Sequence, residues 1–562
     1  MPGRTAGSPA LRWRRRDSGA AISIAAAAVA AVALVVVPLV RLVGVSAGQG
    51  TSSLGRVLAE PGIASAAGHT LLLAVLVPLL AVPLGAGMAV LIRRAVRFST
   101  ALRVAVVLPL VIPQFVLGYS WQLAYGRAGL VSTMVGWHWP GLNGPWGVIV
   151  VLVVDAAPVV FLLSMVGLAT RAQPEMERAA RVSGASGWTM LRTVTLPLLR
   201  PSLAAATVLT FVSALEAFAV PQVLGTPAGF GTMTTLVYAN LSRGSNPDSF
   251  ADAVTLALLL VLAALVVLVP TDLALGPRLG SVRTGQPASA VIGQRPTLAH
   301  RLGISALVGY TAVAVAVPTI SVVAAAITKA TGLPPTPANW TLSNFSTALS
   351  HPVLLAIGNT VLLSAAAATG ALALGALVAM CQRRTAGRLL GTATIATFAV
   401  PGTTLAVGLS IAYGPAIGGT MLLILLAYLA KFWAIAHRTT AAALDRFPDA
   451  ERQAARVSGA GPAVAAGTIW LPAMRSALIG GWLLVFITAL HEVTMSSLLY
   501  SFGSQTLAVV VLNSQELGDI GSTAALSLVL TAMVLAAAVP AWLLVRPPSN
   551  SPRRVAPAGA HR

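Results

Sequence analysis

Runs of about 20 consecutive apolar residues recur along the whole chain, and each run is long enough to cross a lipid bilayer as a helix. In the first half they lie near residues 20–44, 68–92, 104–125, 146–169, 203–224 and 251–272. In the second half they lie near residues 302–328, 354–380, 389–412, 416–436, 477–500 and 522–545. Since 56% of the 562 residues are hydrophobic and only 9% are charged, a soluble globular protein is excluded. We predict an all-α polytopic membrane protein with about twelve spans.

The basic residues predict how these spans are oriented, because short loops rich in Lys and Arg stay in the cytoplasm. With both termini cytoplasmic, 30 of the 36 Lys and Arg residues fall in cytoplasmic segments. The six exceptions are Arg41, Arg56, Arg127, Arg243, Lys329 and Lys431. The net charge of +21 is then explained by topology signals and contacts with membrane lipids, without nucleic acid as a partner.

Three further features indicate the number of spans and the cellular location. The first apolar run, after WRRR, is too long for a cleavable signal peptide, so we expect a retained first helix. The uncharged stretch Leu389 to Ala430 must hold two spans, which break at the turn-rich segment Gly414 to Gly419. An excess of Arg over Lys, 34 to 2, indicates a GC-rich bacterial genome, and we expect a bacterial plasma membrane protein.

One internal repeat divides the chain into two halves. The segment RVSGA occurs at Arg181 to Ala185 and again 275 residues later, at Arg456 to Ala460. A Leu-Pro pair ends thirteen residues after the glycine in both copies, at Pro197 and Pro472. Each half holds an even number of spans, so the copies have the same orientation and the repeat is parallel.

The repeat gives the expected domain boundaries. They are a first half at 1–273 with a cytoplasmic loop at 171–202, a cytoplasmic linker at 274–301, a second half at 302–546 with a loop at 438–476, and a cytoplasmic tail at 547–562.

The repeated loop has the composition of a docking element. A proline followed by acids opens a helix in each copy, at Pro174 and Pro448. Adjacent alanines follow, and Gly184 or Gly459 permits a left-handed cap at the end of the helix. A second short helix is expected to stop near Pro197 or Pro472. Such small residues allow the backbone of another protein to come close.

This loop resembles the signature loop of binding-protein-dependent ABC importer permeases, in which Glu-Ala-Ala, three residues, Gly, nine residues, Ile, one residue and Leu-Pro follow one another. The chain departs from that pattern at Arg178 and Gln453, which replace the Glu, and at Val194, which replaces the Ile in the first copy. The resemblance implies the type I permease fold and a coupling helix in each loop. The implied ATPase-coupling residues are Glu177, Arg178, Ala179, Ala180, Arg181, Gly184, Pro197, Gln453, Ala454, Ala455, Arg456, Gly459 and Pro472.

The same resemblance implies the partners. Two copies of an ABC ATPase subunit would bind the loops, and an extracellular or lipid-anchored substrate-binding protein would deliver the cargo. The chain has two lysines, and neither has the glycine and Ser/Thr neighbours of a phosphate-binding loop. We therefore expect no enzyme activity, no catalytic residue, no bound metal and no cofactor in this chain, with ATP and Mg²⁺ held by the ATPase.

Ionisable residues within membrane spans are costly to bury and are candidates for a pathway. Those considered are Asp155, Glu216, His491 and Glu492, together with Tyr500. At the repeat offset Glu216 aligns with His491. A pathway role and a role as hydrogen-bonded groups that hold the bundle together are both open.

For the cargo, the stretch from Glu492 to Leu507 resembles the corresponding part of ferric-iron permeases, and a fused two-half chain resembles iron and thiamine permeases. We expect ferric iron, with thiamine, phosphonate or polyamine as alternatives. A rival of another class is an ion-coupled secondary transporter, which explains the carboxylates but not the duplicated loop.

Overall fold

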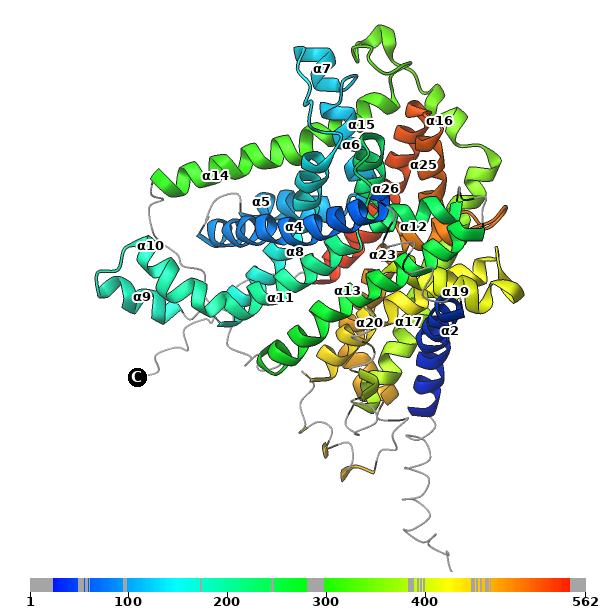
Figure 1. Ribbon diagram of the computed structural model, residues 1–562. Coiled ribbons are helices and arrows are strands. Elements are labelled where there is room, and N and C mark those ends of the chain that lie inside the picture. Colours follow the sequence, from blue (N-terminus) through cyan, green and yellow to red (C-terminus); the bar gives the residue numbers. More distant parts are fainter. Residues whose placement is uncertain are drawn as a thin grey trace, which may run out of the picture.

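The computed structural model describes residues 24–48, 55, 59, 61–94, 99–171, 174–242, 244, 247–279, 298–382, 389–391, 394, 397, 400–445, 450, 453–454, 457–459, 464 and 466–545. Within these ranges the regular structure is helical, and the one β-bridge joins Thr328 and Trp340 (Figure 1). The predicted all-α class is confirmed. The predicted tail and most of the predicted linker lie outside the described residues.

The helices of the first half are η1 (Val32–Val36), α2 (Val37–Gly48), α4 (Pro61–Arg94), α5 (Ser99–Val107), η2 (Leu108–Leu110), α6 (Gln114–Tyr125), α7 (Leu130–Val135), α8 (Pro145–Arg171), α9 (Pro174–Val182), α10 (Gly187–Met190), η3 (Leu191–Thr195), α11 (Leu196–Leu215), η4 (Pro221–Gly225), η5 (Thr226–Ala228), α12 (Met233–Ser242) and α13 (Pro247–Leu279). Those of the second half are α14 (Leu298–Thr311), η6 (Ala312–Ala316), α15 (Val317–Ala326), η7 (Pro337–Asn339), α16 (Ser343–Ala348), α17 (His351–Cys381), α19 (Gly402–Ile417), α20 (Met421–Asp445), η8 (Ala466–Trp470), α23 (Leu471–Leu490), α24 (Thr494–Leu499), α25 (Leu507–Glu516) and α26 (Ile520–Val545).

Each half is built around three mutually packed helices, α4, α8 and α11 in the first and α17, α20 and α23 in the second. Glycine permits a close crossing of two helices in both bundles. A Cβ on Gly85 of α4 would lie 2.9 Å from the Phe161 nitrogen of α8, and one on Gly375 of α17 would lie 2.5 Å from the His437 nitrogen of α20. These contacts bring the backbones together as small residues do between membrane helices, and they match in the two halves.

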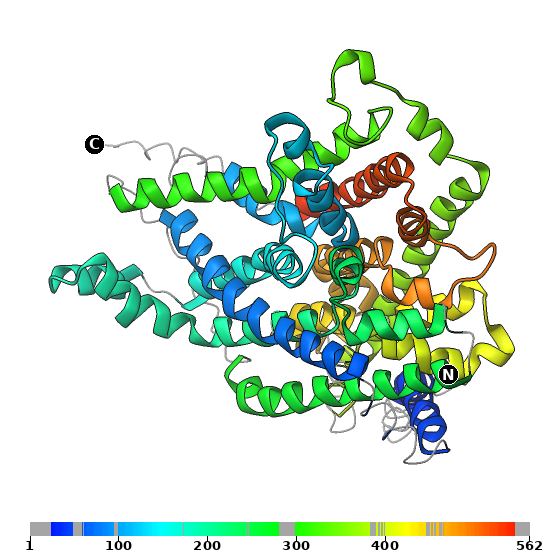
Figure 2. The same cartoon turned by 45° about the horizontal axis from the view of Figure 1, so that its top comes forward.

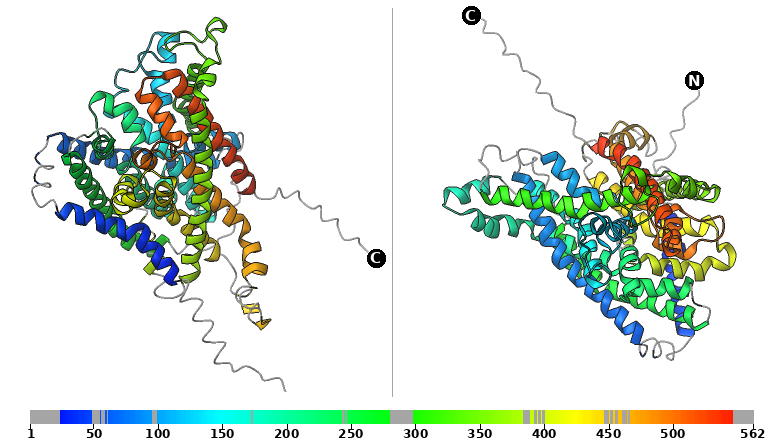
Figure 3. Two further views of the ribbon diagram at one scale, coloured as in Figure 1. Left: turned by 90° about the vertical axis from the view of Figure 1, so that its right-hand side faces the viewer. Right: turned by 90° about the horizontal axis from the view of Figure 1, so that it is seen from above.

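The first helix of each half packs against the other half. Helix α2 contacts α19, and the two lie side by side in Figure 1 and Figure 2. Helix α15 correspondingly contacts α6, while α14 contacts α4 and α5. The right-hand view of Figure 3 shows α14, in green, running alongside the blue and cyan helices of the first half. The halves are therefore interleaved rather than merely abutting.

A tyrosine from the opposite half forms a hydrogen bond with the first helix of each half. The Tyr413 hydroxyl of α19 donates to the Ala33 carbonyl in η1 at 2.7 Å, and the Tyr125 hydroxyl of α6 donates to the Val313 carbonyl in η6 at 2.6 Å. Both carbonyls lie in π-helical turns, five residues before Pro38 and Pro318. Proline has no N–H to donate in the π register, so the tyrosine supplies the donor that the helix lacks.

The described residues contain ten helices long and apolar enough to span a membrane, and a broken eleventh. That eleventh corresponds to the predicted run 104–125, but it bends by 101° between Leu110 and Gln114. The run predicted at 389–412 corresponds in part to α19, which is shorter than a full span; it ends at Ile417, within the predicted break.

Two predicted spans end early. The runs 203–224 and 477–500 stop being helical at Leu215 and Leu490, because the chain turns at Glu216 and His491 and continues as short helical pieces. Uniform hydrophobicity concealed these turns.

The expectation that Pro197 and Pro472 stop a short helix is wrong. Helix α10 continues through the π-helical turn η3 into α11 as one helix from Gly187 to Leu215. Pro197 is the second residue of α11, and Pro472 holds the same place in α23 after η8. The wide turn accommodates the missing N–H, so each proline lies inside a continuous helix.

We predict that Tyr125→Phe and Tyr413→Phe each lower the free energy of unfolding by about 1–2 kcal/mol, because a carbonyl in an apolar setting loses its donor. Tyr310→Phe is the matched control, since the buried Tyr310 hydroxyl has no hydrogen-bond partner among the described residues. Thermal unfolding in detergent measures all three. Equal melting temperatures for the three variants would contradict the role of the tyrosines.

Candidate functional site

The first repeated loop forms a pair of short helices at the end of the molecule. Helices α9 and α10 project away from the bundle at the left of Figure 1. Gly184 has a left-handed φ of 82° after α9, and the Ala185 nitrogen donates to the Ala180 carbonyl at 3.0 Å, which closes the helix as the sequence predicts. Ser186 caps α10 by accepting from the Thr189 nitrogen at 3.1 Å.

The described residues of the second loop have the same cap as the first. Gly459 has a φ of 73°, and the Ser458 nitrogen donates to the Ala454 carbonyl at 2.9 Å. The valine two residues before each glycine is highly exposed, Val182 at 90% and Val457 at 89%. The two loops therefore present the same apolar tip.

The remaining predicted coupling residues divide by burial. Ala179, Gln453, Ala454 and Pro472 are exposed, Ala180 and Pro197 are half-buried, the backbones of Arg178 and Arg181 lie in α9, and Ala455 and Arg456 lie outside the described residues.

Glu177 differs from its neighbours because it faces inward. The residue is only 4% exposed, and its Oε1 accepts from the Arg93 guanidinium of α4 at 2.8 Å. The acid at the start of the repeated motif thus ties the projecting helix to a membrane-spanning helix. It positions α9 rather than offering a surface charge.

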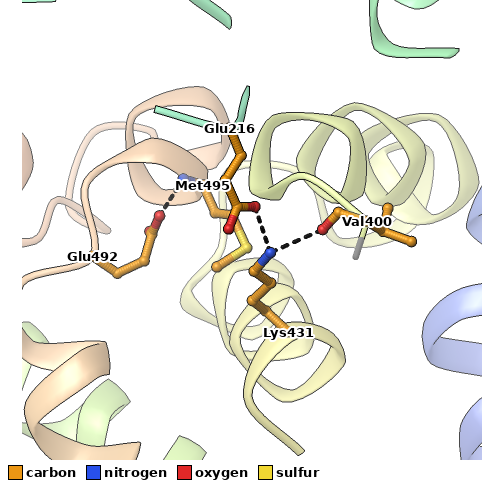
Figure 4. Close-up of polar contacts among 5 residues, drawn as sticks. All are labelled: Glu216, Val400, Lys431, Glu492 and Met495. Carbon is orange, nitrogen blue, oxygen red and sulfur yellow. Dashed lines mark hydrogen bonds and ion pairs between the residues drawn. The ribbon is translucent and has the colours of Figure 1, made fainter. Parts of the chain in front are cut away.

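Among the described residues, an ion pair joins the two halves where the sequence placed candidate pathway residues. The Lys431 ammonium of α20 donates to Glu216 Oε2 at 2.6 Å and to the Val400 carbonyl at 2.9 Å (Figure 4). Glu216 directly follows α11, so the pair spans from the end of one half's helix to the middle of the other's. The side chains of Lys431 and Glu216 are 10% and 21% exposed. Lys431, counted above among the residues outside the cytoplasmic segments, is a buried counter-ion.

The Glu492 carboxylate caps a short helix. Its Oε1 accepts from the Met495 nitrogen at 2.8 Å, and its Oε2 accepts from the Ser496 nitrogen at 3.0 Å, as Figure 4 shows for Met495. These are the first amides of α24, which lack partners within the helix. Tyr428 adds a hydrogen bond to the Ser496 hydroxyl at 2.7 Å. In this conformation both carboxylate oxygens are engaged by the protein.

The other candidate pathway residues have separate surroundings. Asp155 of α8 accepts from the Gln114 amide at the start of α6 at 2.9 Å, beside the break in that span. The His491 Nδ1 atom is buried without a hydrogen-bond partner among the described residues. Tyr500 ends α24, and its hydroxyl accepts from the Asn513 amide at 3.4 Å.

The structure thus joins Glu216 to Lys431, which the sequence reasoning did not select as a pathway residue. A signal was present, because Lys431 is one of two lysines and lies within an apolar run. No group of three or more His, Cys, Asp or Glu that could hold a metal ion occurs in the described parts of the chain.

Comparison with known proteins gives concordant similarities. Residues 81–275 match the family model described as binding-protein-dependent transport system inner membrane component. A ferric transport system permease protein of Actinobacillus pleuropneumoniae is 25% identical over 76% of this chain and 64% of its own length. A probable ABC transporter permease protein of Sinorhizobium fredii is 27% identical over 77% of this chain and 79% of its own length. A molybdenum transport system permease protein of Mycobacterium tuberculosis is 34% identical over 34% of this chain and 71% of its own length. This chain thus spans less than two thirds of the Actinobacillus protein.

We predict that Lys431→Met destabilises the protein by about 3 kcal/mol, because it leaves the half-buried Glu216 carboxylate without its counter-ion. The double variant with Glu216→Gln should recover most of that loss. Lys329→Met is the matched control, since Lys329 is exposed and its ammonium donates to the Ala338 carbonyl. The melting temperatures of the three variants are measured in detergent. An equal decrease in melting temperature for Lys431→Met and Lys329→Met would show that the ion pair does not stabilise the protein.

Proposed function

Because this chain belongs to the family of binding-protein-dependent transport system inner membrane components, we propose that it forms the translocation pathway of an ATP-driven importer. Two copies of a separate ATPase would bind the loops that carry α9 and its repeat, on the cytoplasmic side with both termini. A substrate-binding protein would deliver cargo from outside. ATP and Mg²⁺ would belong to the ATPase.

The observation that supports this proposal most directly is the continuous helix from Gly187 to Leu215. At about 1.5 Å per residue its 29 residues span about 43 Å, from the exposed loop to Glu216. The repeat-related helix begins at the second loop and ends at Leu490, directly before His491. Movement of a docked subunit would be carried along each rigid helix to the charged groups between the halves.

Ferric iron is the proposed cargo. The ferric transport relative aligns with 76% of this chain, including parts of both halves, whereas the molybdenum relative aligns with 34%. Thiamine, phosphonate, polyamine and molybdate remain the alternatives to be tested. The carboxylates of Glu216 and Glu492 already have partners in this conformation, so cargo recognition would lie largely with the binding protein.

Affinity purification of the tagged chain from its native membrane tests the assembly. We expect two ATPase copies for each chain, and iron on the recovered binding protein. Vesicle uptake assays with labelled ferric iron and labelled molybdate then separate those cargoes. A chain that is repeatedly recovered alone, yet takes up substrate along an ion gradient, would instead be a secondary transporter.

The glycine caps provide a sharper test of coupling. We predict that the double variant Gly184→Leu and Gly459→Leu folds in the membrane but fails to retain the ATPase. Both glycines have positive φ with open space around them, so the substitution strains the backbone by about 1–2 kcal/mol at each loop without a clash.

Gly309→Leu with Gly480→Leu is the matched control, because these glycines also have open space but ordinary φ values. The control should keep both uptake and ATPase co-purification. Normal ATPase binding and uptake in the cap variant would remove the coupling assignment.

A further inference from the structure

The Glu216–Lys431 ion pair has a counterpart in the repeat. Glu216 directly follows α11 and His491 directly follows α23, and these positions are 275 residues apart. Lys431 is the eleventh residue of α20, and Asp155 is the eleventh residue of α8. An acid and a base therefore occupy each pair of equivalent places, with their order reversed between the halves.

Packing independently supports the match between Asp155 and Lys431. Gly85 and Gly375, at the helix crossings, approach the nitrogens of Phe161 and His437. Phe161 lies six residues after Asp155, and His437 lies six residues after Lys431. Asp155 and Lys431 thus lie the same number of residues before the equivalent helix crossing in their own halves. This equivalence does not depend on where each helix begins.

In this conformation the two sets differ. Lys431 and Glu216 are in contact at 2.6 Å. Asp155 instead accepts from the Gln114 amide, while the buried Nδ1 atom of His491 has no hydrogen-bond partner among the described residues. Glu216 and Lys431 contact each other, whereas the buried His491 imidazole interacts with the Ile487 backbone and its Nδ1 atom makes no hydrogen bond of good geometry, which is unfavourable in an apolar interior.

We propose that Asp155 and His491 form a second pair across the interface between the halves, in a conformation other than the one described. The imidazole then donates to the carboxylate, and Asp155 leaves the Gln114 amide. The two conformations thereby differ in which acid–base contact joins the halves. The inference rests on the proposed function only in assuming that the chain changes conformation during transport.

Cross-linking tests the proposal directly. Since Cys381 is the one cysteine, Cys381→Ser supplies a cysteine-free background. One variant carries Asp155→Cys with His491→Cys, and the matched control carries Glu216→Cys with Lys431→Cys. Membranes from each are treated with a short bis-methanethiosulfonate reagent, with and without ATP and orthovanadate, and linked peptides are identified by mass spectrometry.

We expect the control pair to link without nucleotide and the Asp155–His491 pair to link more, by at least about fivefold, when nucleotide is trapped. If nucleotide changes the control pair while the second pair never links, the inference is overturned and the proposed function stands. If nucleotide changes neither pair, the proposed function fails as well.

Exchanging the two side chains provides a second test, which measures uptake rather than distance. Asp155→Asn and His491→Gln should each slow uptake about fivefold or more, and the exchanged variant Asp155→His with His491→Asp should restore it to within about twofold. If Asp155 were merely structural, the Asp155→Asn variant would keep its uptake, because the oxygen of the new amide can still accept from Gln114. Additive losses without rescue in the exchanged variant would therefore contradict the pair.

Discussion

Every backbone carbonyl inside a membrane needs a donor from the protein itself, and proline takes one donor away. The chain meets this constraint in a recurrent way. Four π-helical turns, η1, η6, η3 and η8, each end two residues before a proline. In η1 and η6 the unpaired carbonyl accepts a tyrosine hydroxyl from the other half. The hydrogen bonds that replace the missing proline donors thus join the two halves and help to hold them in the interleaved arrangement.

The other two of these turns, η3 and η8, follow the repeated loops. There the wide turn lets α10 run into α11 without a break, so the exposed loop and the interior are parts of one rigid element. The Arg93–Glu177 ion pair holds the loop to α4, and the Glu216–Lys431 pair lies where that element ends. The first pair lies on α9, just before the helix from Gly187 to Leu215, and the second lies just after it. A flexible joint at Pro197 would absorb motion between these two points, and the continuous helix has none.

Features governed by local rules were predictable from the sequence. The apolar runs, the repeat and the caps at Gly184 and Gly459 depend on composition and on neighbours a few residues away. The Glu216–Lys431 pair was not, because its members are 215 residues apart and meet only through the packing of the halves. The turns at Glu216 and His491 were hidden within uniformly apolar sequence. The sequence identified Glu492 as a candidate residue, but it could not show that Glu492 caps α24, because that role depends on the turn before the helix.

The acid–base contact between Glu216 and Lys431 also bears on how the polypeptide finds its own second half during synthesis. The first half leaves the ribosome earlier and could associate with the first half of a neighbouring molecule. Such a match would set Glu216 against Asp155, the residue equivalent to Lys431, and two carboxylates in an apolar interior repel each other. Two second halves would set the Lys431 ammonium against the His491 imidazole in place of the Glu216 carboxylate. Only the pairing of a first half with a second half sets the Glu216 carboxylate against the Lys431 ammonium, so charge would favour that pairing over the two mismatched ones.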